Sequence, residues 1–280
     1  MTPVWLDIDF DFFVRASWLN DFQYSEGKSP LLQNLIWVSR AAGWAARGRS
    51  LRDEMTPRDD VRPEAFVQML RQAGWRFADS CMVVVGDSHA AVGVRVIQHL
   101  IEDDVRPQMV HVDAHHDLGY TRNVGVLRQR RQRGQCEAGD WLWHAARGLR
   151  GRRTGVLDSI RVVYPNWRLE QHCEESRPSD ALLASVGVPV TFEYAGSQIA
   201  HPDGEVIGVS IAQSTAWSPP WLDAEAARFV DSFDMDQVPV MGGLVDRSWD
   251  EKAVASMASA ERQCLDMAGG GCLAMVGTTP

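Results

Sequence analysis

The 280-residue sequence has few cysteines, and their number and spacing exclude two common kinds of structural site. There are five, an odd number, and no two of them form a C-x-x-C pair. A disulfide framework needs paired cysteines and a zinc knuckle needs closely spaced ones, so the sequence predicts neither. Free cysteines are typical of a reducing compartment, and we expect the protein to be cytoplasmic.

Long apolar runs and an excess of positive charge are also missing. No stretch reaches the roughly 18 apolar residues that a membrane span needs, and the start, MTPVWLDIDF, lacks the basic region of a signal peptide. The net charge of −9 argues against a general nucleic-acid binder, which needs a basic surface to neutralise phosphates. We therefore expect neither a membrane nor a nucleic acid among the partners.

What the sequence does have is an alternation of β-branched apolar segments with helical patterns. The segments predicted as buried strands are residues 4–10, 81–86, 108–113, 159–165 and 206–212, with residues 269–277 as a candidate last strand. Apolar residues recur at helical spacing over residues 29–48, 62–75, 90–104, 221–233 and 250–267. This alternation favours parallel crossovers, so we expect a three-layer α/β/α fold with a mainly parallel sheet. With 45% apolar content, residues 1–280 are expected to form a single domain.

Residue types that bind metals gather where three of the predicted strands end. They are Asp7, Asp9 and Asp11 at the first strand, His89 in GDSH after the second, and Asp113, His115 and Asp117 in DAHHD after the third. The carboxyl ends of parallel strands meet at one edge of a sheet, so these side chains should converge. Alternation along an extended strand should also put the three N-terminal aspartates on one face. Buried carboxylates this close repel one another unless a cation lies between them.

The mixture of carboxylates and imidazoles suits manganese, iron or zinc. Carboxylates able to bridge favour a pair of ions roughly 3.5 Å apart, as in binuclear hydrolases. His111 lies inside the third strand and is predicted to be a core histidine, while His116 should point away from its neighbours. His99, His172 and His201 are assigned no role.

Two of these motifs resemble signatures of the arginase and agmatinase (ureohydrolase) superfamily. Residues 86–89, GDSH, are similar to its G-D-H segment with one extra residue before the histidine, and residues 113–117 match D-A-H-x-D. The third signature normally reads S-F-D-x-D-x-x-D-P and comes last in the chain. SFDMDQVP at 232–239, with Asp234 and Asp236, has the expected order but follows a helical pattern.

A second candidate for the third signature is LDIDFDFF at residues 6–13, which ends a clean strand. It resembles the D-I-D-L-D-F-F signature of a divergent arginase-like family that includes the peptide arginases of ribosomal-peptide (RiPP) biosynthesis. We favour this N-terminal segment. The resemblance then implies an arginase-deacetylase-like fold whose metal-binding strands are circularly permuted, which a parallel sheet with neighbouring termini tolerates.

Carried over by motif, the resemblance implies two manganese ions. One would be bound by Asp9, His89, Asp113 and Asp117, and the other by Asp9, Asp11, Asp113 and His115. Asp9 and Asp113 would bridge, and Asp7 is the reserve ligand if the register is shifted by two residues. In ureohydrolases a bridging hydroxide attacks the guanidinium carbon, and the intermediate collapses to urea and an amine.

The resemblance also implies roles beyond the metal ligands. His144, which follows the second motif, would be the catalytic histidine beside Asp117, and Glu137 or Asp140 would bind the guanidinium group. Trp141, with Trp143, Trp217 and Trp221, is a candidate wall of a peptide groove. No segment matches the family's loop for the free α-amino and α-carboxylate groups of arginine. We therefore expect the substrate to be arginine in a precursor peptide, converted to ornithine.

Other functions remain open at this stage. A haloacid-dehalogenase-type phosphatase needs a lysine after a strand, but the chain has only Lys28 and Lys252, and neither follows one. A metal-dependent amide deacetylase, a ureohydrolase of free arginine or agmatine, and a non-catalytic, metal-stabilised peptide-binding protein are the remaining alternatives. A homo-oligomer is compatible with all of them. The basic segments 127–135 and 146–153 are expected to be either solvated loops or a docking surface for an acidic partner.

Overall fold

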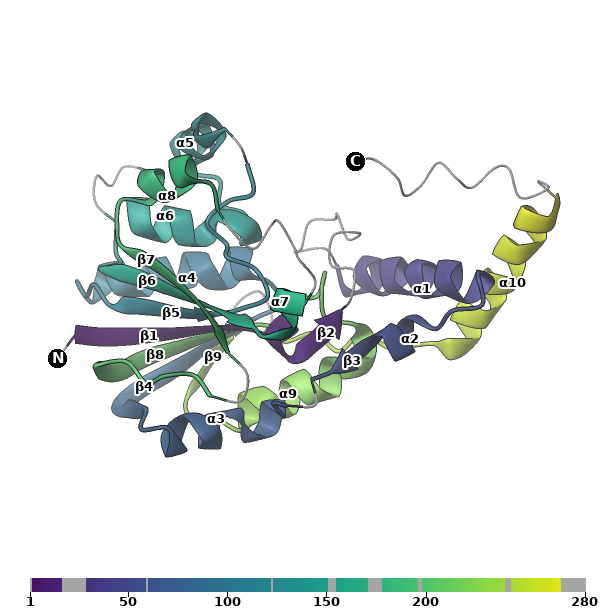
Figure 1. Cartoon of the computed structure of the whole chain (residues 1–280), viewed down its shortest axis with the longest axis horizontal. Coiled ribbons are helices and arrows are strands. Elements are labelled where there is room, and N and C mark those ends of the chain that lie inside the picture. Colours follow the sequence, from purple (N-terminus) through teal and green to yellow (C-terminus); the bar gives the residue numbers. More distant parts are fainter. Residues whose placement is uncertain are drawn as a thin grey trace.

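The computed structural model describes residues 2–16, 29–58, 60–121, 123–150, 155–170, 178–195, 198–239 and 243–267. Within these residues, seven strands form one sheet in the order β7-β6-β5-β1-β8-β4-β9, and every neighbouring pair is parallel. Helices cover both faces of this sheet, which confirms the predicted three-layer α/β/α fold (Figure 1). The candidate last strand at residues 269–277, and His172, lie outside the described residues.

The five strands expected from the sequence all form. They are β1 (Thr2–Asp9), β4 (Arg76–Gly86), β5 (Gln108–Val112), β6 (Ser159–Pro165) and β8 (Gly204–Ala212). The sequence did not reveal the edge strands β7 (Val190–Ala195) and β9 (Gln237–Pro239), because β7 is only half-buried and β9 is very short. The central strand β1 lies between β5 and β8, which explains why its residues from Val4 to Asp9 are all buried, whichever face of the sheet they point to.

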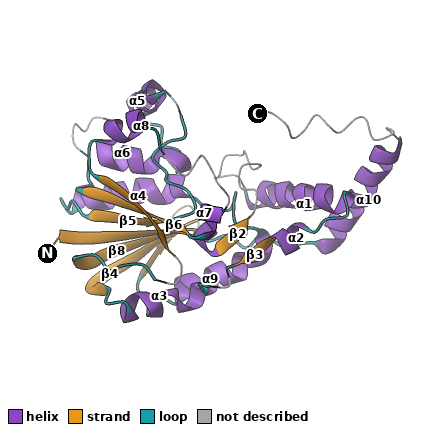
Figure 2. Cartoon of the chain, viewed as in Figure 1, coloured by secondary structure: helices purple, strands orange, loops and turns teal. Residues whose placement is uncertain are grey.

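Helices form two layers on the sheet and an extension beyond it. One layer contains α4 (His89–Glu102), α5 (Val124–Arg133), α6 (Trp141–Arg147) and α8 (Asp180–Val186), and the other contains α3 (Pro63–Gln72) and α9 (Asp223–Asp231) (Figure 2). The extension contains α1 (Pro30–Ala46), α2 (Leu51–Glu54), α10 (Glu251–Met267) and the antiparallel pair β2 (Val14–Ala16) and β3 (Met55–Pro57). A short helix, α7 (Trp167–Glu170), follows β6. No helix among the described residues has both the length and the apolar character to cross a membrane.

The basic segment at residues 127–135 is mostly helical. Of its two expected forms, a solvated loop or a docking surface for an acidic partner, the loop is wrong, because α5 continues to Arg133 and ends at Gly134, whose φ of +71° suits a helix C-terminus. Three arginines therefore lie in the last turn of α5, where the helix dipole favours positive charge. The second basic segment is described as far as Arg150.

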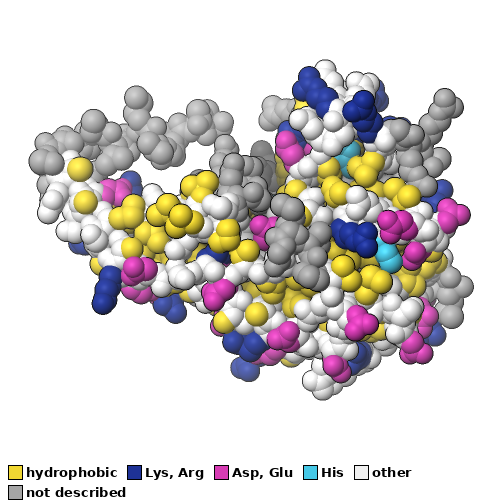
Figure 3. Space-filling view, turned by 180° about the vertical axis from the view of Figure 1, so that it is seen from behind, with side chains coloured by type: hydrophobic (Ala, Val, Ile, Leu, Met, Phe, Trp, Pro, Cys, Tyr) yellow, Lys and Arg dark blue, Asp and Glu magenta, His cyan; other side chains and the backbone are white. Residues whose placement is uncertain are grey.

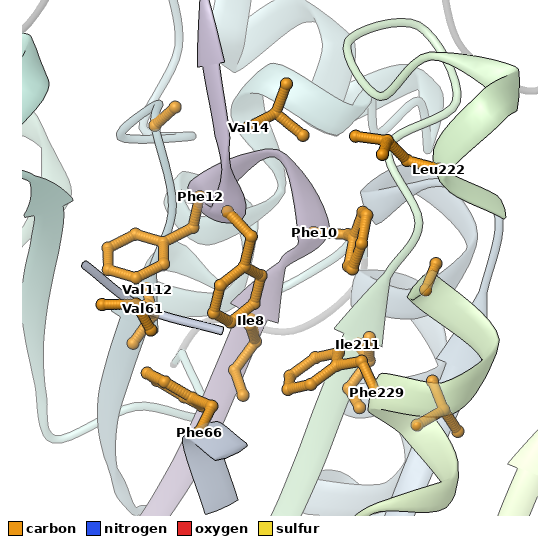
Figure 4. Packing of buried hydrophobic residues seen from close by; sticks show 14 of the residues in the cluster. Ile8, Phe10, Phe12, Val14, Val61, Phe66, Val112, Ile211, Leu222 and Phe229 are labelled. Carbon is orange, nitrogen blue, oxygen red and sulfur yellow. The ribbon is translucent and has the colours of Figure 1, made fainter. Parts of the chain in front are cut away.

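A cluster of phenylalanines fixes the turn that follows β1. This turn is the 3-10 helix η1 (Phe10–Phe13), and all of its residues are buried. The ring of Phe13 packs 5.1 Å from that of Phe66 on α3 and 4.9 Å from that of Phe229 on α9. Phe12 and Phe10 of the same turn also face these two rings, with ring centres 6.2 Å from Phe66 and 6.1 Å from Phe229 respectively (Figure 4). The helix layer on this face of the sheet therefore holds the segment that carries Asp9 and Asp11 in a single conformation.

Candidate metal centre

The carboxyl ends of β1, β4 and β5 bring the predicted ligands together at one edge of the sheet. Asp9 is the last residue of β1, and Asp113 directly follows β5, which pairs with β1. His89 is the first residue of α4 because Ser88 caps that helix, accepting the N–H of Ala90 at 3.1 Å. We call the six residues that meet here the ligand cluster: Asp9, Asp11, His89, Asp113, His115 and Asp117, all of them buried.

One half of the ligand cluster surrounds His89. Its Nδ1 lies 3.1 Å from Oδ2 of Asp9 and 3.1 Å from Oδ2 of Asp117. Oδ2 of Asp113 lies 3.7 Å from the same nitrogen. These four residues are the set that the motifs predict for the first metal.

The other half of the ligand cluster surrounds His115. Its Nδ1 lies 2.9 Å from Oδ2 of Asp11 and 3.3 Å from Oδ1 of Asp113. Asp113 thus presents one oxygen to each histidine, as a bridging carboxylate would. Asp9 lies only with the first half, and its Oδ1 accepts the N–H of Asp11 at 2.9 Å. Bridging by Asp9 stays a prediction.

The route by which Asp11 reaches the ligand cluster differs from the expected one. It lies in the turn η1 rather than on an extended strand, so strand alternation does not explain its position. The turn instead swings its side chain toward the loop after β5, where Oδ1 of Asp11 accepts the N–H of Ala114 at 3.2 Å. That loop also bends sharply, since Asp117 has a φ of +48°, a left-handed conformation that aspartate tolerates better than most residues.

Two further residues support the ligand cluster from behind. Oδ2 of Asp7 lies 3.1 Å from Nε2 of His89 and is hydrogen-bonded at 2.6 Å to Nδ1 of His111, while Oδ1 accepts the hydroxyl of Ser210. This position suits a group that orients the histidine ligand, and Asp7, His89 and His111 also lie close enough together to hold an ion, so the reserve role of Asp7 stays a prediction. His111 is buried, as predicted, but its Nε2 lies 3.1 Å from Oδ2 of Asp113, so it contacts the ligand cluster. Asp7 and His111 are each a polar residue inside an apolar strand segment, which was the sequence signal for a contact between them; the structure pairs the two directly between β1 and β5.

His116 takes no part in the ligand cluster. Its Nδ1 accepts the N–H of Leu118 at 3.1 Å, and its ring stacks on Tyr120 with the ring centres 4.3 Å apart. Burial and the positive charges of His115 and His111 lower the pKa of His116 to about 3, so it is neutral at physiological pH.

The ligand cluster holds more carboxylates than its histidines can neutralise. Burial and the charges of Asp11 and Asp113 raise the pKa of Asp9 well above its usual value, and burial and Asp113 also raise the pKa values of Asp11 and Asp117. Burial opposes protonation of His115, but the charge of Asp11 raises its pKa well above normal. Such mutual perturbation is what closely spaced buried charges produce, and a divalent cation would relieve it.

The fit to a metal is supported by unsatisfied oxygens. Oδ2 of Asp11 and Oδ2 of Asp113 are buried beside imidazole nitrogens, Nδ1 of His115 at 2.9 Å and Nε2 of His111 at 3.1 Å, but neither has a hydrogen bond of good geometry to a described residue. Buried polar atoms rarely lack a partner, and carboxylate oxygens beside imidazole nitrogens are the donor set of manganese, iron or zinc. The buried aspartates and histidines of this edge could therefore hold a metal ion.

A cavity of about 370 Å³ reaches the ligand cluster. Asp9, His89, His115 and Asp117 line it together with Tyr120, Cys136, Glu137, Ser214 and Trp217. The ring of Trp217 lies 4.7 Å from that of His115, so this tryptophan forms an aromatic wall as expected. Tyr120 was not predicted from the sequence. We call this space the site cavity; its volume falls within the range of small-molecule sites.

Several residues assigned to the substrate lie elsewhere. Trp141 is fully buried and stacks on His89, with 5.6 Å between ring centres, so the expectation that it contacts substrate is corrected: it lies behind the histidine. Trp143 is also buried and donates to Ser185 at 2.9 Å. Trp221 packs on Trp249, with the ring centres 4.8 Å apart. Of the four tryptophans proposed for the groove, Trp217 alone is among the described residues that line the site cavity.

The polar residues of the same segment do not all reach the site cavity. Glu137 lines the site cavity and pairs with Arg130 at 2.8 Å. Asp140 is buried, 2.8 Å from the same guanidinium group, and is not among the described cavity-lining residues. His144 is fully buried with Nε2 3.5 Å from Oδ1 of Asp140. The structure therefore does not bring His144 or Asp140 to the position where a substrate would lie.

The late motif SFDMDQVP does not contribute to the ligand cluster. Asp234 and Asp236 are exposed, in the turn between α9 and β9. The structure therefore places LDIDFD, at the start of the chain, where the ligands meet. No family model, curated protein or solved structure matches the chain.

Proposed function

We propose that this protein is a binuclear manganese hydrolase that converts arginine side chains in a peptide to ornithine and releases urea. The observation that carries the proposal is the position of Asp113, with Oδ1 facing His115 and Oδ2 facing His89. When bound there, a pair of divalent ions supplies an activated water at neutral pH and polarises the group under attack. The choice of manganese and of a guanidinium substrate comes from the resemblance of the three motifs to ureohydrolases.

The side chains of the site cavity fit an arginine side chain. Glu137 presents a carboxylate to the site cavity, where it could bind a substrate guanidinium group beside that of Arg130, with which it pairs at 2.8 Å. Trp217 offers an aromatic face to the aliphatic part of the side chain. Asp117 also lines the site cavity, so its carboxylate lies where it could contact the substrate.

The composition of the site cavity favours peptide-bound over free arginine. None of the described residues that line it is a lysine or an arginine. A free amino acid carries an α-carboxylate, which such a site would normally pair with a cationic side chain. In a peptide that carboxylate is an amide, and no cation is needed.

The test is an assay of the manganese-loaded protein on three substrates: a blocked peptide containing arginine, free arginine, and a peptide containing acetyl-lysine. Urea is measured in solution, and ornithine in the peptide is detected by mass spectrometry. We expect urea and ornithine from the arginine peptide alone. Asp113→Asn, which preserves shape but removes the charge, is the matched inactive control.

Each other outcome points to one of the alternatives. Urea from free arginine but not from the peptide would indicate a metabolic ureohydrolase, and acetate from acetyl-lysine would indicate a deacetylase. Absence of all products, with the arginine peptide still bound, would indicate a non-catalytic peptide-binding protein.

A further inference from the structure

A second cavity, of about 470 Å³, lies among α5, α6 and α8 and is lined mainly by positive charge. Its arginines are Arg128, Arg131, Arg147 and Arg150. None of the described residues that line it is acidic. Lysine and arginine side chains gather at the top of the molecule, where α5 lies (Figure 3). We call this cavity the arginine pocket.

The local structure explains why these guanidinium groups face one space. Arg128 and Arg131 are three residues apart on α5, and residues at that spacing share a side of a helix. Nε of Arg131 donates to the carbonyl of Gly148 at 2.6 Å, which fixes the plane of its guanidinium group. Arg147 is the last residue of α6 and lies against Gly187, where a larger residue would displace it.

Arg130, on the same helix, does not line the arginine pocket. It pairs with both Glu137 and Asp140 at 2.8 Å, so carboxylates of the chain itself neutralise it. The helix dipole at the end of α5 favours a positive charge at Arg131. It does not explain the position of Arg150, which lies beyond the end of α6. Arg128, Arg147 and Arg150 are exposed, so solvent screens part of their mutual repulsion, but they gather with Arg131 around one cavity in a chain whose net charge is −9. A ligand with several carboxylates would remove the repulsion and form charge-assisted hydrogen bonds.

We infer that the arginine pocket binds an acidic segment of the peptide substrate, a conclusion that rests on the proposed function for its choice of a peptide. Helix α6 connects the two sites, because Trp141 at its start stacks on His89 and Arg147 at its end lines the arginine pocket. The helical rise between these two residues is about 9 Å, so both sites border the same short helix.

The test is fluorescence anisotropy with a labelled peptide of eight glutamates and the full-length, manganese-loaded protein. The double variant Arg128→Gln/Arg147→Gln should weaken binding by about tenfold or more, as loss of charge-assisted contacts implies. Arg133→Gln is the matched control, since Arg133 is exposed on the same helix and does not line the arginine pocket. It should change the affinity less than about twofold.

Two results would overturn the inference. One is equal affinity of the wild-type protein and the double variant for the acidic peptide. The other is tighter binding of a single-stranded RNA of similar length that is lost in the same double variant, which would make the arginine pocket a nucleic-acid site. A circular dichroism spectrum and a urea melt identical to those of the wild type establish that the double variant is folded.

The experiment distinguishes an error in the arginine-pocket inference from an error in the proposed function, because peptide binding is measured without turnover. Binding of the acidic peptide without any urea release would contradict the hydrolase alone. Urea release from arginine peptides without acidic-peptide binding would contradict the arginine pocket alone. If both hold, an acidic segment placed near the arginine should lower KM without changing kcat, and the double variant should abolish that difference.

Discussion

Nδ1 of His89 lies 3.1 Å from Oδ2 of Asp9, so the first residue of α4 meets the last residue of β1. This contact joins the GDSH segment to the start of the chain rather than to its late SFDMDQVP motif. It depends on burial of β1 in the middle of the sheet, between β5 and β8. The assignment of the N-terminal strand as a metal-binding strand follows from this arrangement.

The first prediction concerns which aspartates bind metal. Asp9→Ala and Asp113→Ala should each abolish metal loading, because each removes a carboxylate that faces His89. Asp234→Ala should load normally, since Asp234 is exposed in a turn. The metal content of each purified variant after loading and dialysis is the measurement. Loss of metal in Asp234→Ala with normal loading of Asp9→Ala would show that the late motif supplies the ligands.

The five inner strands of the sheet and the ligand cluster were predictable because they depend on local pattern. A buried parallel strand is an apolar run, and the polar residues that follow it mark the carboxyl edge of the sheet, as Asp113 after β5 illustrates. Asp11 was placed correctly but for the wrong reason, since the turn η1, fixed by packing of Phe13, brings it there. Sequence spacing does not encode such packing.

The segment from Glu137 to His144 could not be placed from the sequence for a related reason. Proximity in the chain suggested that all its polar residues face the substrate. Their actual positions depend on how α6 packs against α4, where Gly93 leaves room for the ring of Trp141. Nothing in the sequence pattern identifies that long-range contact.

This contact yields a second prediction. A Cβ at Gly93 would lie 2.6 Å from the buried ring of Trp141, so Gly93→Ala must displace an indole that has little space to move. We expect a loss of about 1–3 kcal/mol in the free energy of unfolding and weaker metal binding, because the ring supports His89. Urea denaturation and metal titration measure the two effects.

The control for Gly93 is Gly43→Ala on α1. A Cβ there lies 3.2 Å from the end of the Arg47 side chain, which is flexible, so this variant should be neutral or slightly stabilising. If both variants unfold at the same urea concentration as the wild type, the packing of Trp141 is not tight.

The third prediction concerns pH and the metal-free protein. Burial lowers the pKa of His111, but the charges and hydrogen bonds of Asp113 and Asp7 together outweigh it and raise that pKa from 6.5 to about 10; the pKa values of His89 and His115 are also raised. The folded protein therefore binds more protons than the unfolded chain, and these groups stabilise it fully below pH 6.5. That stability is lost as the pH rises toward 10.

The melting temperature of the metal-free protein should accordingly fall between pH 7 and pH 9, and manganese should suppress the fall by replacing the protons. His116 does not disturb this test, because its pKa of about 3 confines its effect to lower pH. A metal-free melting temperature that rises over this range would contradict the charge balance derived for the ligand cluster.

The fourth prediction concerns the loop that carries Trp217. Arg247 is fully buried, and its Nε donates to Asp223 at 3.1 Å while Nη1 and Nη2 donate to the carbonyls of Thr215 at 2.7 Å and Ser218 at 2.8 Å. Arg247→Ala would leave a buried carboxylate unpaired and should cost about 3–5 kcal/mol.

A matched variant shows how much of the loss in stability comes from the burial of Arg247 rather than from its charge alone. Arg228→Ala removes an exposed arginine that lies 3.4 Å from Glu225, and it should cost less than about 1 kcal/mol. Urea denaturation compares the two. Equal losses would mean that Arg247 does not organise the loop.

The most direct test of the central claim is the number of manganese ions bound per chain, measured by elemental analysis after loading and dialysis. Because Asp113 presents one oxygen to each histidine, the account predicts two ions in the wild-type protein and loss of both in Asp113→Ala. A count of one ion, or none, in the wild-type protein would contradict a binuclear centre.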